Sequence, residues 1–579
     1  MPDPIRYRAV VTALLVASCG SPPAPAKTTA ADTAAEVAAT DTTAPDVVDT
    51  AVVQADTAPA DTTTAGDVAA AAVCEGETAA PTAFSTGPFG VHRHDIAADF
   101  SMDLVDGTTF EFSKAFTGCD SYVFVPDSIP ISELTPASIW TKDVAALLKN
   151  SPKNVHYFFV SRSSNAANVE KVTADMQDRV LAALTDLDAD TGAHWFPRLH
   201  VAKKSAMGQG NWVGEVLANG HGRIGFGIDR WQRIRGFGML ADVTRSDPKL
   251  QAAGKWPWQA NLAYAAHEPQ AWNAEFARYT KLQAAKTTVV ELWKGETLAE
   301  FAETDANLPG APTMATYDTL QIEVDMRCPK ADDPEPGNCG AWDYLAGLSV
   351  QSADGKNIEI ARFITSYHRE THWLVDVTPM LALLQAGGKR HFRWDFAPSW
   401  NTQPTNTWLK LHLSNQNKGI RPVAAMYLWG DAAFNSKYDA AHPDQTVNVP
   451  PTAKQVQLWA LVTGHGADKA TQCAEFCNHE HHFGVNGTPF VLNFPMAGTQ
   501  SKCMDNIGNG MSPNQGGTWW FGRGGWCPGM QVQPWMQDVT AQAKAGSAVK
   551  VSYAGKLGGK TPPDGEGNIH LTSYLVVYE

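Results

Sequence analysis

The chain has 579 residues, a formal net charge of -15 and 19 tryptophans. A charge this negative argues against nucleic acid or anionic lipid as a partner, because both repel an acidic surface. After a long N-terminal segment, the remaining length is sufficient for about three domains of ordinary size.

The first nineteen residues predict a processing signal. Arg6 and Arg8 form a basic start, and residues 9–17 form an apolar run that is too short to span a membrane. The run ends in Val16-Ala17-Ser18-Cys19, which resembles a bacterial lipobox and implies that Cys19 is lipidated and becomes the mature N-terminus. The alternative is a signal peptide that is cleaved at another small residue. We expect a protein of the bacterial cell envelope, periplasmic or surface-exposed, that touches the membrane only through this lipid anchor.

Residues 20–80 predict a disordered linker between the lipid anchor and the folded part. Ala, Thr, Asp and Pro dominate this segment, and large aliphatic residues are scarce. Such a composition cannot bury enough apolar surface to offset the entropy lost on ordering.

Residues 85–283 predict an α/β layer fold, because strand patterns alternate with helical ones. A hairpin is expected over 100–112 with its turn at Asp106-Gly107, strands over 122–125, 156–161 and 224–228, and a helix over 169–187. With the stretch Ala98-Asp-Phe-Ser-Met-Asp-Leu-Val-Asp-Gly107, this order resembles a thioredoxin-like or peroxiredoxin-like domain. That chemistry needs a low-pKa cysteine after a strand, and residues 126–128 are Pro-Asp-Ser. We therefore expect a scaffold or binding module rather than an active oxidoreductase.

The chain from residue 284 onward predicts β-structure. Short strand patterns are separated by Gly, Pro and Asn, which is typical of β-sandwiches and jelly rolls. Because this part is too long for one sandwich, we expect one jelly-roll domain over 284–435 and a second over 436–579.

The cysteines predict disulfides. If Cys19 carries lipid, eight remain, and an even number in an exported protein is typical of a disulfide set. Neighbours in sequence suggest the pairs Cys328–Cys339, Cys473–Cys477 and Cys503–Cys527, which leave Cys74 with Cys119 by elimination. The alternative is a zinc site at Cys473, Cys477 and His479.

Five motifs follow one another through the β half. They are Arg327-Cys-Pro329 with Cys339-Gly-Ala-Trp-Asp343, Ile358-Glu-Ile-Ala-Arg-Phe-Ile-Thr-Ser-Tyr367, Val375-Asp-Val-Thr378, Cys473-Ala-Glu-Phe-Cys477 and Arg523-Gly-Gly-Trp-Cys-Pro-Gly-Met530. Together they resemble the peptide-N-glycosidase F family, amidases that remove N-glycans. The resemblance begins at about residue 285. It implies two adjacent jelly-roll domains with the active site in the cleft between them.

The resemblance also implies roles for individual residues. Asp343 corresponds to the family's primary catalytic aspartate and Glu475 to its second catalytic acid. Arg523 corresponds to a functional arginine near them, and Asp395 is the best match to an acid that helps to bind the core sugars. Two positions depart from the family pattern: Tyr344 stands where a basic residue is normal, and Thr463-Gly-His-Gly466 lacks an expected tryptophan. Both departures bear on sugar binding and leave the pair of acids intact.

Two neighbouring carboxyl groups suit the hydrolysis of an asparagine side-chain amide. The reaction needs a base for water, stabilisation of charge at the carbonyl and a proton for the leaving glycosylamine. Repulsion keeps one carboxyl of a close pair protonated, so that one acts as base and the other as acid. Asp343 is expected on a strand over 342–351 and Glu475 between two cysteines that fix its position. Arg523 either holds the ionised partner or polarises the carbonyl.

Aromatic and histidine side chains leave alternatives open. Trp520 and Trp526 either stack on sugar rings or belong to the core. The run His479-Glu-His-His482 is a rival site, because His479 and His481 share a face in an extended chain, as in some copper or zinc sites. Without a metal, these histidines are expected to bind sugar or face solvent.

We therefore expect a monomeric amidase without cofactor or metal. It hydrolyses the bond between Asn and the innermost N-acetylglucosamine of N-glycosylated proteins or peptides, and converts Asn to Asp. The alternatives are a non-catalytic glycan-binding lipoprotein and a copper-dependent monooxygenase on a related double jelly-roll fold.

Overall fold

The computed structural model describes residues 74, 80–127, 139–141, 143–221, 224–246, 258–333, 335, 338–340, 342–466 and 474–579. The predicted signal peptide, Cys19, most of the predicted linker and Cys473 lie outside the described residues. Among the described residues, no helix is long and apolar enough to cross a membrane.

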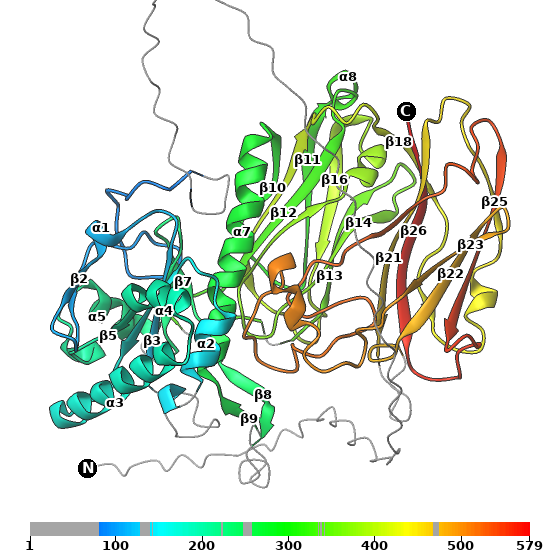
Figure 1. The fold of residues 1–579 in the computed structure, drawn as a ribbon. Coiled ribbons are helices and arrows are strands. Elements are labelled where there is room, and N and C mark those ends of the chain that lie inside the picture. Colours follow the sequence, from blue (N-terminus) through cyan, green and yellow to red (C-terminus); the bar gives the residue numbers. More distant parts are fainter. Residues whose placement is uncertain are drawn as a thin grey trace, which may run out of the picture. The chain divides into compact units, whose positions relative to one another are not determined.

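Residues 288–414 form the first β-sandwich (Figure 1). One antiparallel sheet has the strand order β10-β17-β12-β15 and the other the order β11-β16-β13-β14. In chain order, the first, eighth, third and sixth strands share one sheet, and the second, seventh, fourth and fifth share the other, which defines a jelly roll. The bounds are β10 Thr288–Leu298, β11 Phe301–Gly310, α8 Ala311–Met314, β12 Thr319–Arg327, β13 Leu345–Gln351, β14 Asn357–Ile364, β15 Thr371–Asp376, η6 Thr378–Leu383, β16 Gly387–Asp395 and β17 Thr405–Ser414.

Strand β12 shows how the sequence places side chains on both faces of a sheet. Leu320, Ile322 and Val324 alternate along the strand and are fully buried in the core between the two sheets. Glu323, on the opposite face, is buried as well, because helix α7 (His267–Ala284) covers that face. The Tyr279 hydroxyl of this helix contacts Glu323 directly.

Residues 422–578 form the second sandwich with the same topology. Its sheets have the orders β18-β26-β21-β24 and β20-β25-β22-β23, and β19 also pairs with β26. The bounds are β18 Pro422–Tyr427, β19 Ala432–Ala433, η7 Asp439–Ala441, β20 Gln445–Asn448, β21 Gln455–His465, β22 His479–Val485, β23 Thr488–Asn493, η8 Met504–Asn509, β24 Trp535–Asp538, β25 Ala548–Leu557 and β26 Asn568–Tyr578. The prediction of two jelly rolls is therefore correct.

The predicted boundary at 435/436 falls too late in the chain. β18 and β19 both pair with β26, so the second sandwich begins at Pro422. The strand pattern is weak there, because Ala424 and Ala425 carry no large side chain to mark an inward face.

The N-terminal region contains a mixed sheet of order β5-β4-β3-β6-β7 (Figure 1). Strands β3, β4 and β5 are parallel, and β6 and β7 are antiparallel to their neighbours. The helices and strands of this region, including those of the sheet, are β1 Ser101–Asp103, β2 Thr109–Glu111, α1 Phe112–Ala115, β3 Ser121–Pro126, η1 Ile139–Thr141, α2 Val144–Asn150, β4 Val155–Val160, α3 Ala166–Thr185, α4 Ala189–Trp195, η2 Phe196–Arg198, β5 Leu199–Val201, η3 Ala206–Gly208, α5 Trp212–Val216, η4 Leu217–His221, β6 Phe226–Ile228, β7 Ile234–Gly236, β8 Ala241–Ser246, β9 Trp258–Ala260 and η5 Leu262–Ala266. The predicted hairpin, strands and helix correspond to β1–β2, β3, β4, β6 and α3.

Three of the four expected disulfides are present. They join Cys74 to Cys119, Cys328 to Cys339 and Cys503 to Cys527. The fourth expected pair includes Cys473, which lies outside the described residues, so Cys473–Cys477 stays a prediction.

Candidate active site

Asp343 lies in the loop that enters β13. The sequence pattern placed it on the strand, but the strand begins at Leu345. The residue after it is fixed to the end of β14, because the Tyr344 amide donates to Thr365 Oγ1 (2.8 Å) and the Thr365 amide donates to the Tyr344 carbonyl (2.9 Å). Asp343 is thereby held at the edge of the sandwich, where its side chain retains 14% exposure.

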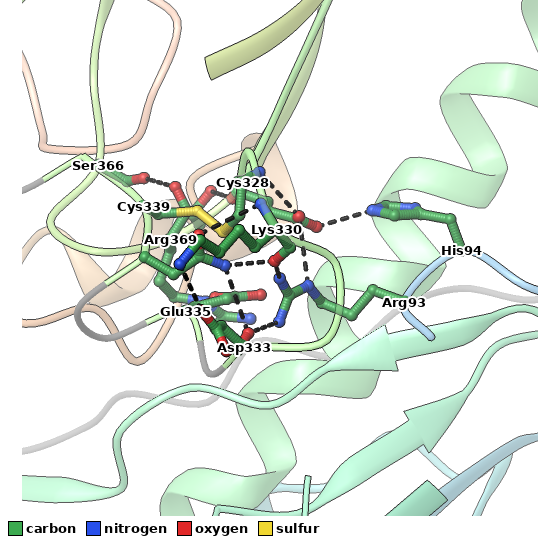
Figure 2. Close-up of a disulfide and its surroundings, with 12 residues drawn as sticks. Arg93, His94, Cys328, Lys330, Asp333, Glu335, Cys339, Ser366 and Arg369 are labelled. Carbon is green, nitrogen blue, oxygen red and sulfur yellow. Dashed lines mark hydrogen bonds and ion pairs between the residues drawn. A yellow bond between two sulfur atoms is a disulfide. The ribbon is translucent and has the colours of Figure 1, made fainter. Parts of the chain in front are cut away.

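The Cys328–Cys339 disulfide closes the loop that leads to Asp343, and Figure 2 shows its surroundings. Glu370 accepts from the Cys328 amide (2.9 Å) and pairs with His94 (2.7 Å). Arg93 donates to the carbonyl of Lys330 (2.7 Å) inside the same loop. This loop is therefore held both by its disulfide and by two side chains from the N-terminal region.

Glu475 lies between β21 and β22, and its backbone is held by the loop that carries Arg523. The Gly524 amide donates to the Glu475 carbonyl (2.7 Å), and the Gly464 amide donates to the Gly524 carbonyl (2.8 Å). The Glu475 side chain is 20% exposed. Two loops of the second sandwich thus place the carboxylate and the arginine side by side.

Arg523 joins the two predicted catalytic acids. Its Nε lies 3.2 Å from Glu475 Oε1, and its Nη2 lies 3.2 Å from Asp343 Oδ2. Nη1 donates to the carbonyls of Thr518 (3.0 Å) and Phe521 (2.7 Å), and Nη2 also donates to Thr518 Oγ1 (3.0 Å). A guanidinium has five N–H donors, so every donor of this buried side chain is in use. In this structure Arg523 therefore contacts both carboxyl groups and has no N–H donor left for a further acceptor.

The two carboxyl groups share this single positive charge. Burial raises the pKa of Glu475 to about 7; Arg523 opposes the rise and Asp343 adds to it. Burial also raises the pKa of Asp343, against the opposing effects of Arg523 and a hydrogen bond from Tyr367. One positive charge does not balance two negative ones in a poorly solvated place, so the site retains a proton near neutral pH.

Tyr367 is a site residue that the sequence analysis did not single out. Its hydroxyl hydrogen-bonds to Asp343, and burial followed by the nearby Asp343 charge raises its pKa well above the ordinary value. Its ring packs against Gly517, where a Cβ atom would lie 2.6 Å from the ring. The available signal was its place at the end of the motif 358–367.

The tryptophans divide into buried and exposed groups. Trp520 and Trp526 are each 4% exposed, so both rings are packed inside the protein, and Trp526 donates to the Gly464 carbonyl (2.7 Å). Trp342, next to Asp343, is 45% exposed, and Trp400 is 77% exposed. The Trp400 ring meets Tyr344 edge-on at 5.7 Å. Trp342 and Trp400 thus expose ring surface at or against the residues that flank Asp343, whereas the buried Trp526 ring packs on the Arg523 guanidinium (4.8 Å).

Asp395 lies apart from this arrangement. It ends β16 and forms an ion pair with Arg393 (2.7 Å), whose guanidinium stacks on Phe301 (4.0 Å). None of the contacts recorded for Asp395 in the described part of the chain reaches Asp343, Glu475 or Arg523. Its sugar-binding role stays a prediction.

Two of the three histidines in the run of β22 point into the second sandwich, whereas His482 is partly exposed and pairs with Glu480 (2.9 Å). His479 and His481 share a face as predicted, but both are fully buried, which corrects the expectation of sugar-binding or solvent-facing side chains. His479 Nδ1 lies 2.6 Å from His481 Nε2, and His481 Nδ1 lies 2.6 Å from the Tyr553 hydroxyl. Burial lowers the pKa of His479 to about 4. These are neutral core histidines bonded to each other.

Fold and site together define a double jelly-roll protein in which loops of both sandwiches hold two carboxyl groups on one arginine. Residues 433–576 match the family model described as "Peptide-N-glycosidase F, C terminal". The resemblance that the motifs predicted is confirmed.

Relatives match a longer stretch of the chain than the family model does. The chain is 24% identical over 300 residues to the peptide-N(4)-(N-acetyl-beta-D-glucosaminyl)asparagine amidase F of Elizabethkingia miricola, which covers 49% of this chain and 79% of that protein. Similar solved structures include PNGase F, a glycosylasparaginase from Flavobacterium meningosepticum (20% identity, 50% of this chain, 96% of that chain, TM-score 0.40). Another is PNGF-II (12% identity, 52% and 66%, TM-score 0.37). Because these TM-scores are low, the similarity to the family rests on the sequence matches.

Proposed function

We propose that this protein is a peptide-N-glycosidase, an amidase that hydrolyses the bond between the Asn side chain and the innermost N-acetylglucosamine of N-glycoproteins or glycopeptides. The observation that carries the proposal is the Asp343–Arg523–Glu475 arrangement. The family motifs predict these three residues as site residues, although they lie far apart in the sequence, and they meet in the fold.

The roles follow from the charges. Asp343 receives hydrogen bonds from Arg523 and Tyr367, which stabilise its ionised form, so it acts as the base that takes a proton from water. Glu475, with a pKa raised to about 7, holds a proton that it gives to the leaving glycosylamine nitrogen. Water oxygen bonds to the amide carbon, the carbon–nitrogen bond breaks, and the peptide keeps an aspartate. Arg523 holds both carboxyl groups in position throughout.

A glycopeptide incubated with the protein in heavy-oxygen water tests this proposal. We expect mass spectrometry to show conversion of Asn to Asp at the glycan site with one heavy oxygen incorporated, because water supplies that oxygen. We also expect the reaction to continue in excess EDTA, since the two carboxyl groups and water suffice. An intact glycopeptide would contradict the amidase; binding without cleavage would instead support the glycan-binding lipoprotein.

We further propose that residues 85–283 are a thioredoxin-like scaffold without redox chemistry. The mixed sheet with antiparallel β6 supports this. The region has Cys119 as its single cysteine, and Cys119 is bonded to Cys74. Reactivity with a thiol reagent under native conditions, assigned to Cys119, would contradict the proposal.

Attachment through lipid on Cys19 to a bacterial envelope also remains a proposal, supported by the sequence of residues 1–19. Action as a monomer is a separate proposal. Labelling with a fatty-acid analogue, lost in Cys19→Ser, tests the anchor. Sedimentation of the protein lacking the first nineteen residues tests the monomer.

A further inference from the structure

The segment 514–518 connects the N-terminal region to the active-site side chains. It belongs to the long loop between β23 and β24 that also carries Arg523 and the Cys503–Cys527 disulfide. One end of the segment contacts the N-terminal region, and the other end contacts Tyr367 and Arg523.

Asn514 is the residue that the N-terminal region holds. It is fully buried, and its Nδ2 donates to Glu268 Oε1 (2.8 Å) and to the Tyr264 carbonyl (3.0 Å). Its Oδ1 lies 3.2 Å from His267 Nδ1, and its backbone carbonyl accepts from the Met239 amide (2.7 Å). Both polar groups of the side chain and the carbonyl of the same residue are thus bound by the N-terminal region.

Glu268 is fixed in turn by the first sandwich. Arg369 Nη1 lies 2.9 Å from Glu268 Oε1 and also donates to the Pro513 carbonyl (2.6 Å), directly before Asn514. Both ionic side chains are almost completely buried, which makes this a strong and directional contact. Arg369 lies two residues after Tyr367 in the chain, so the same ion pair fixes the loop that carries Tyr367.

The residues after Asn514 bind the active-site side chains one after another. Gln515 Oε1 accepts from the Tyr367 amide (2.9 Å), and the Gly516 amide donates to the Tyr367 carbonyl (3.2 Å). The Thr518 carbonyl and hydroxyl both accept from Arg523 (3.0 Å each). A shift of Asn514 would therefore reach both groups that hold Asp343.

We propose that Asn514, held by Glu268 and its neighbours in the N-terminal region, is a positioning residue that sets the geometry of Tyr367 and Arg523 around Asp343. This gives the N-terminal region a role in the reaction, and the inference rests on the amidase proposed above. It assigns no contact between the N-terminal region and the reacting atoms.

Asn514→Gly is the variant that tests the proposal. Asn514 has a φ of +50°, a conformation that glycine adopts without strain, so the change removes the side-chain bonds and little else. We expect kcat to fall by about tenfold to a hundredfold, since a misplacement of about 1 Å costs that much, while KM changes little. The acidic limb of the rate profile should also move to higher pH, because Arg523 and Tyr367 both lower the pKa of Asp343.

Asn273→Ala is the matched control. This residue is on the same helix as Glu268, but its side chain bonds with Asn154 inside the N-terminal region (2.7 Å). We expect lower thermal stability with wild-type kcat and an unshifted pH profile. Wild-type kinetics in Asn514→Gly, or an equal loss of kcat in Asn273→Ala, would overturn the proposal.

Hydrogen exchange provides a readout that does not depend on the amidase reaction. We expect faster amide exchange over residues 362–368 and 514–524 in Asn514→Gly but not in Asn273→Ala. Equal protection in both variants would overturn the positioning role. If the wild-type protein cleaves no glycopeptide, the proposed function fails, and this exchange comparison still decides whether Asn514 holds the loop.

Discussion

Buried carboxyl side chains in two regions of this protein have pKa values that are shifted in opposite directions. Glu323, under helix α7, is bound by His412 (2.7 Å), His372 (3.3 Å) and the Tyr279 hydroxyl. Burial alone would raise its pKa, but these hydrogen bonds outweigh burial and lower it. Asp343 and Glu475 share one arginine between them, and burial raises the pKa of both.

The difference separates a structural carboxylate from the two carboxyl groups proposed to be catalytic. Glu323 has enough partners to stay ionised, so it contributes to packing between α7 and the first sandwich. The Asp343–Glu475 pair has too few partners to stay doubly ionised, so it retains a proton near neutral pH that a reaction can use. A raised pKa thus distinguishes the Asp343–Glu475 pair from Glu323.

The largest expected effect belongs to Asp343→Asn. The variant keeps the volume but removes the base, so we expect kcat to fall by about a thousandfold or more. Thermal melting should stay near wild type. Asp305→Asn is the control and should cleave at nearly the wild-type rate, because Asp305 is exposed and pairs with Lys389 (2.8 Å). Wild-type turnover by Asp343→Asn would remove this residue from the mechanism.

Glu475→Gln should lower kcat by about a hundredfold. In the wild type, the rate should fall as pH rises through about 7, where Glu475 loses its proton. The variant has no such proton to lose, so this basic limb should disappear from its profile. A basic limb that persists unchanged in the variant would assign the proton to another group.

Glu323→Gln should act on stability instead. Breaking a buried ionic network by removing one partner costs about 3–5 kcal/mol. Because the pKa of Glu323 is lowered in the folded protein, its contribution is present above its ordinary value of 4.5 and is lost as pH falls below it. We expect urea unfolding to show the loss at pH 7, with kcat close to wild type.

The contribution of Glu475 to folding stability depends on pH in the opposite direction. Its pKa is raised on folding, so its contribution is present below 4.5 and is lost as pH rises toward about 7. Glu475→Gln should therefore unfold at equal or higher urea concentration than the wild type at pH 8. If Glu475→Gln destabilised the protein as much as Glu323→Gln, the two carboxyl groups would contribute to stability in the same way, which would contradict the comparison.

The smallest effects concern the exposed aromatic rings. Trp400→Ala should raise KM for a glycopeptide several-fold, because an aromatic contact contributes about 0.5–1.5 kcal/mol. Trp520→Ala should instead destabilise the protein by about 3–5 kcal/mol, as expected for a buried ring. A higher KM in Trp520→Ala than in Trp400→Ala, at equal stability, would restore the original assignment of Trp520 to the substrate.

The sequence was sufficient for the strand patterns and for the three residues at the centre of the site. Asp343, Glu475 and Arg523 each lie in a short sequence motif, and these motifs follow one another along the chain in the order typical of the family. The place of Tyr367 at the end of the motif 358–367 does not show its role, because that role depends on contacts with Gln515 and Gly517, about 150 residues later. Burial of Trp520 and His479 also depends on distant segments, since an aromatic ring or an imidazole suits either a core or a surface.

Infrared spectroscopy can show directly whether the Glu475 carboxyl group is protonated at neutral pH. The C=O band of a protonated carboxyl group, isolated as the difference between wild type and Glu475→Gln, can be followed from pH 4 to pH 9. We expect this band to persist at pH 6 and to disappear with a midpoint near 7. A midpoint at the ordinary value of 4.5 would show that Glu475 is ionised at neutral pH, and would contradict its role as the proton donor.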